Sequence, residues 1–143
     1  GFGEGWALYA ERLADELGLF SNDESRLGML SSAAWRAARL VVDTGLHAFG
    51  WTRQQAIDTL LAHTAMPAEQ AAQEVDRYIS WPGQATSYMV GYLEIAALRK
   101  EAQTRLGTRF DLRRFHDAVL RNGSLPLPVL RAEITRWIEA GGA

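Results

Sequence analysis

Residues 1–18, GFGEGWALYAERLADELG, set the fold class of this chain. Their apolar side chains recur every three or four positions, as on one face of an α-helix, and a glycine stands where that helix would end. The apolar positions are Trp6, Leu8, Tyr9, Leu13 and Leu17. The stretch therefore predicts an amphipathic helix at the start of the chain.

The rest of the chain repeats this pattern, with polar caps, prolines and glycines between the segments. Further helices are predicted from about 21–25 to 50, then over 53–63, 68–80, 85–106, 112–122 and from 126 or 128 to 139. The apolar stripe of the second helix includes Leu27, Leu30, Trp35, Leu40, Val41 and Leu46. No run alternates apolar and polar residues as a strand would. We predict one all-α domain of about seven helices over residues 1–143.

Composition excludes several classes of protein. The chain has 143 residues, 48% of them hydrophobic, enough for one domain with a buried core. A net charge of −2 gives no electrostatic footprint for nucleic acid, and no apolar run approaches the length of a bilayer span. The absence of cysteine excludes disulfides and thiolate metal sites. Because the first residue is Gly rather than Met, we expect the chain to come from a longer polypeptide.

Glu4 and Glu11 stand seven residues apart, nearly two helical turns, so both project from one helix face. One interpretation is a solvated acidic stripe near a helix N-terminus, where negative charge is favoured. The other is that Glu4 reaches a cation supplied from elsewhere. Glycines at positions 3 and 5 would let backbone or a ligand approach Glu4 closely.

The three histidines do not form a metal site by themselves. His47, His63 and His116 lack the i, i+4 spacing that places two ligands on one helix face, so a histidine-based zinc site within this chain is not predicted. His47 follows Asp43 by four residues, and that carboxylate could orient its imidazole. The alternative is a helix-end histidine satisfied by a neighbour.

The stretch WPGQATSYMVGYLEI, residues 81–95, carries two tyrosines one turn apart after a Pro-Gly break. The hydroxyl of Tyr88 or Tyr92 could donate a hydrogen bond to a developing oxyanion. The alternative is a pair of half-buried tyrosines that cover the core. Gly91 between them would permit close helix packing or ligand approach.

Four ordered blocks carry a family resemblance. They are EGWALYAERLADELG (4–18), WRAARLVVDTGLHAFGW (35–51), YISWPGQATSYMVGYLEI (78–95) and FDLRRFHDAVLRNGSLPLPVL (110–130). Together they resemble the C-terminal part of a bacterial family known as domain of unknown function 885. That family is similar to helical zinc metallopeptidases of the gluzincin type, in which an upstream His-Glu helix supplies two histidine ligands and the general base, and a downstream glutamate is the third ligand.

The resemblance implies a role for four residues. Glu4 matches the third zinc ligand. Glu11 could orient a histidine ligand without binding the metal itself. By analogy, His47 and Tyr88 resemble the histidine and tyrosine that hold substrate and stabilise the tetrahedral intermediate. The implied reaction of the intact protein is peptide-bond hydrolysis by zinc-activated water.

The upstream His-Glu helix is not in this chain, so we expect the 143 residues alone to bind no zinc stably and to be inactive. We expect the face that meets the missing helices to be exposed, with Trp6, Trp51 and Trp81 among its residues, and to promote self-association. The alternative function is a non-enzymatic all-helical interaction module. A serine hydrolase using Ser87 or Ser124 is disfavoured, because neither lies in a nucleophile-elbow sequence.

Overall fold

Seven α-helices and one short 3₁₀-helix make up the part of the chain that the computed structural model describes, residues 1–142. These residues contain no strand, so the predicted all-α class is confirmed. The helices are α1 (Phe2–Glu16), α2 (Asp23–Ala48), α3 (Arg53–His63), α4 (Ala68–Ser80), α5 (Ser87–Leu106), α6 (Leu112–Leu120) and α7 (Leu127–Glu139), with η1 (Gly107–Arg109) after α5. Within the same residues, none of the helices is long and apolar enough to cross a bilayer.

Side-chain caps fix the start of three helices close to the predicted positions. Asn22 accepts a hydrogen bond from the Ser25 amide at the start of α2, and Asp111 caps α6 in the same way. At α3, which was predicted to begin at residue 53, Thr52 and Gln55 form a capping box, in which each side chain accepts from the other residue's backbone amide. These caps satisfy amides that have no partner within the helix, which is why local sequence located these ends well.

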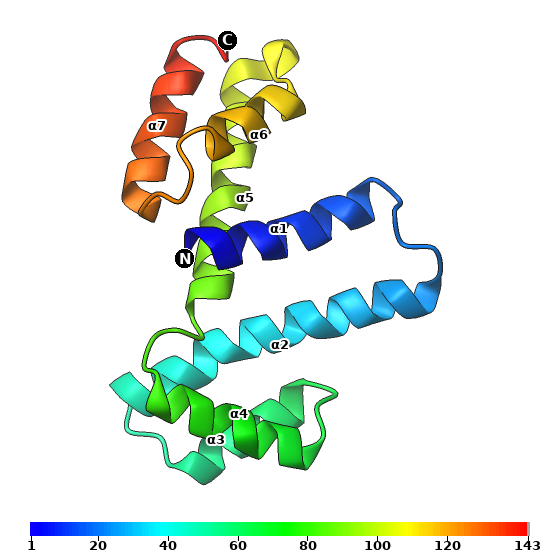
Figure 1. The fold of residues 1–143 in the computed structure, drawn as a ribbon, viewed down its shortest axis with the longest axis vertical. Coiled ribbons are helices and arrows are strands. Elements are labelled where there is room, and N and C mark those ends of the chain that lie inside the picture. Colours follow the sequence, from blue (N-terminus) through cyan, green and yellow to red (C-terminus); the bar gives the residue numbers. More distant parts are fainter. Residues whose placement is uncertain (143) are drawn as a thin grey trace.

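Helix α1 crosses α5 backbone to backbone, as Figure 1 shows. The contact lies at Gly5 and Gly91, where a Cβ added to either residue would overlap the backbone of the other helix. Only glycine allows so close an approach. By contrast, Gly3 has open space around it. The glycines of the opening stretch are thus explained in part by helix packing, as predicted for Gly91.

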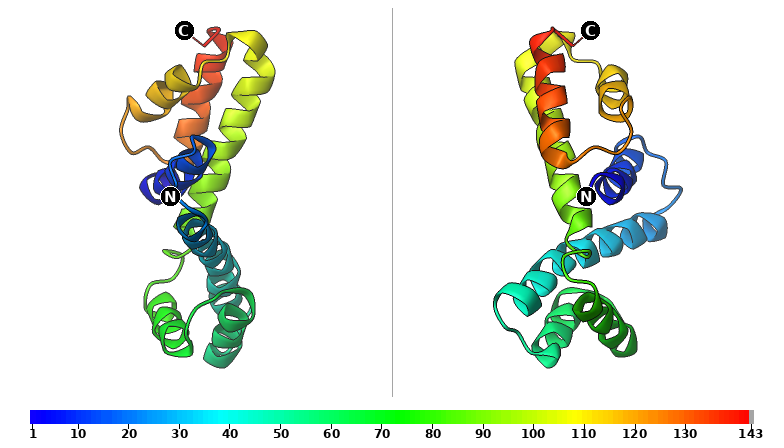
Figure 2. Two further views of the ribbon diagram at one scale, coloured as in Figure 1. Left: turned by 90° about the vertical axis from the view of Figure 1, so that its right-hand side faces the viewer. Right: turned by 60° about the vertical axis from the view of Figure 1, so that its left-hand side comes forward.

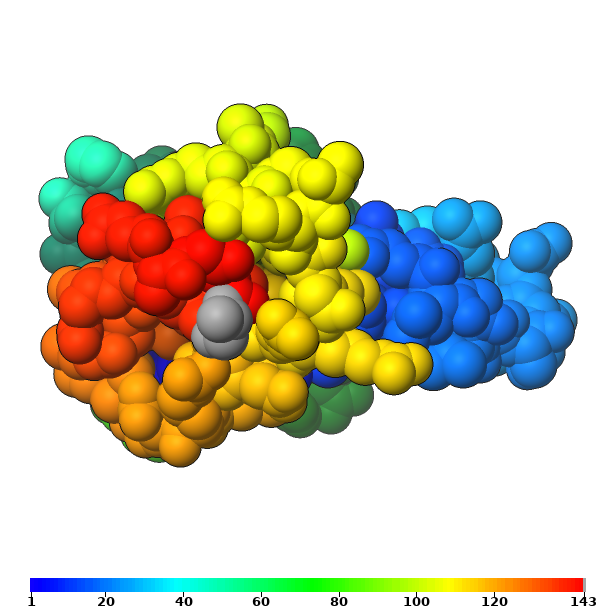
Figure 3. All heavy atoms as spheres, turned by 90° about the horizontal axis from the view of Figure 1, so that it is seen from above, coloured from blue at the N-terminus to red at the C-terminus, as the bar shows by residue number. Residues whose placement is uncertain are grey.

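The buried apolar residues form two separate clusters, which correspond to the two ends of the elongated molecule in Figure 2. The α5 cluster joins α1, α5, α6 and α7 through Phe2, Tyr9, Ile95, Leu98, Phe115, Leu130 and Ile134, among others. The α4 cluster joins α2, α3 and α4 through Ala38, Val42, Leu60, Val75 and Tyr78, among others. Figure 3, seen from the C-terminal end of α5, shows α1 and the start of α2 projecting sideways from the packed helices.

The predicted apolar stripe of α2 is only partly buried. Leu27 is 67% exposed, and Leu30 and Val41 are also exposed, whereas Trp35, Leu40 and Leu46 are half-buried. The buried positions of this helix include Met29, Val42 and two charged residues, Arg39 and Asp43. Charged residues are almost never fully buried unless they have partners. Those partners come from distant parts of the chain, so the apolar pattern alone did not predict that these two residues are buried.

The three tryptophans expected on an exposed face behave differently. Trp81 is 62% exposed, as predicted. Trp6 is half-buried against the α5 cluster, and Trp51 is half-buried against the α4 cluster, where its ring fills the space beside Gly45. For these two, full exposure was a wrong expectation, because each packs on its own cluster. Self-association remains a prediction.

Candidate functional site

Arg39 is the centre of a buried polar cluster between α2, α4 and α5. Only 6% of the residue is exposed, and its guanidinium carbon lies 4.2 Å from the ring centroid of Trp35 and 4.8 Å from that of Tyr88. Its Nε donates a 3.1 Å hydrogen bond to the Tyr78 hydroxyl, which also accepts from the indole nitrogen of Trp35 at 3.1 Å. A planar guanidinium suits this position because it stacks on aromatic rings and donates in its own plane.

Glu74 on α4 balances the charge of this cluster. Its Oε2 accepts from Nη2 of Arg39 at 3.1 Å and from Nη2 of Arg77 at 3.0 Å. Burial alone would raise the pKa of Glu74, but the hydrogen bond from Arg77 and the charges of both arginines lower it overall. Burial raises the pKa of the Tyr78 phenol. Glu74 therefore stays ionised and Tyr78 protonated, so the cluster keeps its hydrogen-bond pattern around neutral pH.

Asp43, one turn after Arg39, holds the turn before α5. It is 3% exposed, and both carboxylate oxygens accept from the backbone amide of Gly83 at 3.1 Å. Gly83 has φ +80°, a conformation that favours glycine, and lies in the predicted Pro-Gly break. The buried carboxylate therefore fixes the loop that sets where α5 begins.

His47 is the helix-end histidine satisfied by a neighbour, one of the two interpretations of the sequence. Its Nε2 donates to the carbonyl oxygen of Tyr78 at 3.0 Å, while Asp43 accepts from the Gly83 amide. The other interpretation, a bond between Asp43 and His47, is not observed, because α4 and its following turn offer each side chain a different backbone partner. Since a carbonyl can only accept, neutral His47 carries its proton on Nε2 and leaves Nδ1 as an acceptor.

Sequence reasoning missed Arg39 and Tyr78, although a signal was present. Trp35, Arg39, Asp43 and His47 are spaced by four along α2, so they line one face. All four contact Tyr78 or the turn that follows it. We call this row the α2 polar ladder. An aromatic residue followed by three polar ones at that spacing was the pattern to notice.

Glu4 is half-buried near the start of α1, and no hydrogen bond or ion pair joins its carboxylate to another of residues 1–142. Further along the same face, Asp15 pairs with Arg26 of α2 at 2.8 Å. Glu11 lies 3.9 Å from Arg36 of α2, and its other oxygen is buried without a partner among the described residues. At Glu11 and Asp15 this face of α1 is thus directed toward α2.

Tyr88 and Tyr92 take different environments despite lying one turn apart. Tyr92 packs against the α5 cluster, in line with the core-covering interpretation. The ring of Tyr88 is half-buried against Arg39, and within residues 1–142 its hydroxyl makes no hydrogen bond. The hydroxyl of neighbouring Ser87 donates to the Gln84 carbonyl at 2.7 Å, so it is already used in a hydrogen bond within the turn. Tyr88 is therefore the better candidate donor of the pair.

His116 belongs to a second polar group, on the α5 cluster. Its Nε2 lies 2.8 Å from the Tyr9 hydroxyl, which also accepts from Arg99 at 3.2 Å. Because Tyr9 accepts from Arg99, its own proton is free to be donated to Nε2. Burial, and then the nearby charge of Arg99, lowers the pKa of His116. His116 therefore packs within the α5 cluster, with its ring against those of Trp6, Tyr9 and Phe115.

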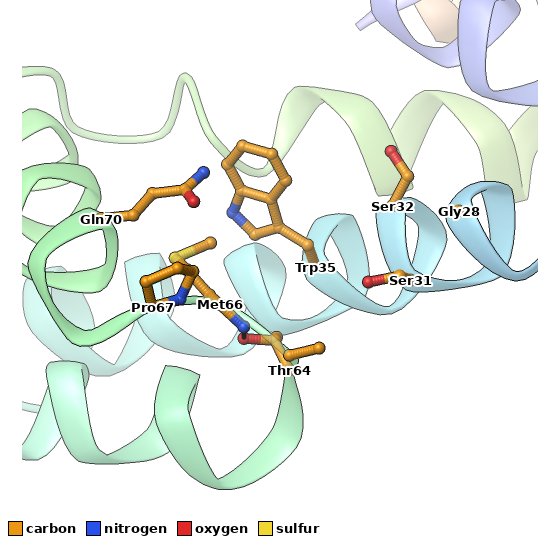
Figure 4. A pocket seen from close by; sticks show the side chains of 9 residues that line it. Gly28, Ser31, Ser32, Trp35, Thr64, Met66, Pro67 and Gln70 are labelled. Atoms are coloured by element: carbon orange, nitrogen blue, oxygen red, sulfur yellow. Dashed lines mark hydrogen bonds between the residues drawn. The ribbon is translucent and has the colours of Figure 1, made fainter.

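A cavity of about 240 Å³ opens beside the ladder, between α2 and the start of α4. Figure 4 shows the Trp35 ring extending from α2 toward Gln70 and Met66, with Ser31 and Ser32 farther along the helix. Trp35 thus lines this cavity with one face of its indole while its nitrogen is bonded to Tyr78. The cavity and the Arg39 cluster share one side chain.

No group of three or more His, Cys, Asp or Glu side chains within residues 1–142 is arranged to hold a metal ion. Glu4 offers one half-buried carboxylate without a partner in those residues, which fits a single ligand position. A stable zinc site needs three or four protein ligands. Residues 1–142 therefore do not form such a site by themselves, and Glu4 could fill at most one of its ligand positions.

Comparison with known proteins places the chain in a family. The family described as "Bacterial protein of unknown function (DUF885)" matches residues 1–134. The chain belongs to this family. A solved structure described as the "putative lipoprotein from Colwellia psychrerythraea" is 48% identical to this chain, with a TM-score of 0.91. The similarity covers 96% of this chain and 24% of that one, so this chain spans about a quarter of the length of that relative. None of the curated proteins matches.

Proposed function

We propose that this DUF885 chain is the downstream part of a zinc-dependent peptidase, with Glu4 as one zinc ligand and Tyr88 as the donor to the oxyanion. One observation carries the proposal: both groups are half-buried, and within residues 1–142 neither the carboxylate nor the hydroxyl has a partner. Neither the Glu4 oxygens nor the Tyr88 hydroxyl is among the buried side-chain atoms that lack a partner, so both groups are open to a ligand that arrives from outside. The gluzincin resemblance supplies the zinc and the peptide carbonyl as those partners.

Each of the four residues has a distinct task in this proposal. Glu4 would complete a zinc site whose histidine ligands and general base come from an upstream segment. Glu11, whose Oε2 is buried without a partner in the described residues, would accept from one of those histidines. His47 would accept from a substrate N–H through Nδ1, since Nε2 is bonded to Tyr78. Tyr88 would donate to the carbonyl oxygen as negative charge develops on it.

Zinc, when bound, supplies a water of lowered pKa for attack on the peptide carbonyl. The length of the solved relative supports an upstream segment, because three quarters of that chain lies outside the similarity. The substrate class follows from the resemblance alone: a peptide in extended form, which offers the carbonyl and N–H that Tyr88 and His47 would bind.

The test is zinc content in the full-length polypeptide that carries this segment. Glu4→Ala should reduce zinc per chain strongly, while Glu16→Ala, on the same helix and paired with Arg99, should leave zinc unchanged. Glu4→Gln should also lose zinc, because the amide keeps the shape and removes the charge. Zinc retained at the unaltered level in both Glu4 variants contradicts the ligand assignment. A full-length protein with no zinc and no peptidase activity would favour the interaction-module alternative.

A further inference from the structure

The contacts of Tyr88 are divided between its ring and its hydroxyl. The ring stacks on the Arg39 guanidinium at 4.8 Å, whereas the hydroxyl has no partner in residues 1–142. A side chain held by its ring and open at its polar end is suited to donate to a group that arrives from outside. Arg39 in turn cannot move freely, because Trp35, Tyr78 and Glu74 hold it on its other sides.

The backbone that carries Tyr88 is held by the next residue of the α2 polar ladder. Tyr88 is the second residue of α5, and the preceding turn is tied to Asp43 through the Gly83 amide. Within this turn, the Thr86 hydroxyl donates to the Gly83 carbonyl at 2.7 Å and the Ser87 amide donates to Gln84 at 3.1 Å. The direction in which α5 starts therefore depends on one buried carboxylate.

We propose that Arg39 and Asp43 are positioning residues for Tyr88: Arg39 fixes its ring, and Asp43 fixes the turn from which its helix begins. This inference rests on the proposed function for its catalytic consequence. Its structural part, the coupling of α2 to the first turn of α5, stands on the contacts alone. Precise placement matters because a misplacement of about 1 Å at a reacting group can cost about a hundredfold in rate.

Replacing Arg39 with Met is a usable variant, since it leaves no polar partner stranded. Glu74 keeps its hydrogen bond from Arg77, and the Tyr78 hydroxyl keeps the one from Trp35. Arg53→Met is a matched control: it also removes an arginine bonded to α4, through Asp76 at 2.6 and 2.9 Å, and does not contact Tyr88. Asp43→Asn removes the charge at the turn and keeps one acceptor oxygen.

The first measurement is a double-mutant cycle in the zinc-loaded full-length protein, with a quenched-fluorescence peptide that the unaltered protein cleaves. Arg39→Met should lower kcat by about tenfold or more, leave KM within about twofold and leave zinc content unchanged. In a Tyr88→Phe background, Arg39→Met should change kcat by less than about twofold, because the hydroxyl that Arg39 positions is no longer present. Equal loss in both backgrounds overturns the positioning role.

The second measurement needs no activity: hydrogen exchange over residues 81–92 of the same protein. Arg39→Met and Asp43→Asn should each accelerate exchange there by about tenfold, whereas Arg53→Met should not. Unchanged exchange in both ladder variants overturns the inference. If exchange accelerates while Tyr88→Phe keeps full kcat, the coupling holds and the oxyanion role of Tyr88 fails, so the two ideas are separable.

Discussion

Helix α5 is held near its N-terminal end by two contacts of opposite character. Against α1 the contact is backbone on backbone at Gly5 and Gly91, with no room for a side chain. Against α2 it is polar: Arg39 stacks on Tyr88, and Asp43 binds the preceding turn. At the α1 contact a single added methyl group would overlap backbone atoms. At the α2 contact several residues bind the same partners, so removing one side chain weakens the contact without abolishing it.

The largest expected effect comes from filling the backbone contact. A methyl group on Gly91 would overlap the carbonyl oxygen of Gly1, so Gly91→Ala should destabilise the chain by about 3 kcal/mol in urea unfolding. Gly3→Ala on the same helix has open space and should stabilise by up to about 1 kcal/mol through helix propensity. Similar losses in both variants would mean that the crossing is looser than the structure has it.

A smaller loss of stability is expected from the polar contact between α2 and α5, and the effects of two substitutions there should not be additive. Arg39→Met should cost less than about 3 kcal/mol, because Arg77 still neutralises Glu74. Arg39→Met combined with Arg77→Met should exceed the sum of the single changes by at least about 0.5 kcal/mol, since Glu74 then has no cation. Urea unfolding of the four proteins measures this. Strict additivity would show that the two arginines do not share Glu74.

The smallest effect is a pH dependence at the α5 cluster. Because burial and Arg99 lower the pKa of His116, the folded chain binds fewer protons than the unfolded one below the ordinary pKa of about 6.5. The free energy of unfolding should therefore be highest above that pH and decrease as the pH falls through the lowered pKa of His116. His116→Gln should flatten this part of the stability curve relative to the unaltered chain. A parallel curve for the variant would assign the dependence to other groups.

How far the sequence predicted this protein depended on the range of the interactions. Caps and stops act over three or four residues, so the starts of α3 and α6 and the Pro-Gly break before α5 were located correctly. The partners of Asp43 and His47 lie on α4 and the turn after it, 31 to 40 positions away. Of the two interpretations of His47, the local pairing with Asp43 is therefore not observed, and the helix-end histidine satisfied by a neighbour is confirmed. The roles of Glu4, Glu11, His47 and Tyr88 came from the family resemblance and stay proposals.

The sequence by itself determined seven helices, their approximate limits and the all-α class, because those depend on periodicity and capping. Only the tertiary structure decided which face of α2 is buried. Burying Arg39 and Asp43 is favourable only when Glu74, Tyr78 and the Gly83 amide are brought beside them, and those groups meet α2 only after the chain has folded. The tertiary structure also decided why Gly5 and Gly91 must be glycine. They are 86 positions apart in the sequence, and each lies against the backbone of the other helix, where a side chain would not fit.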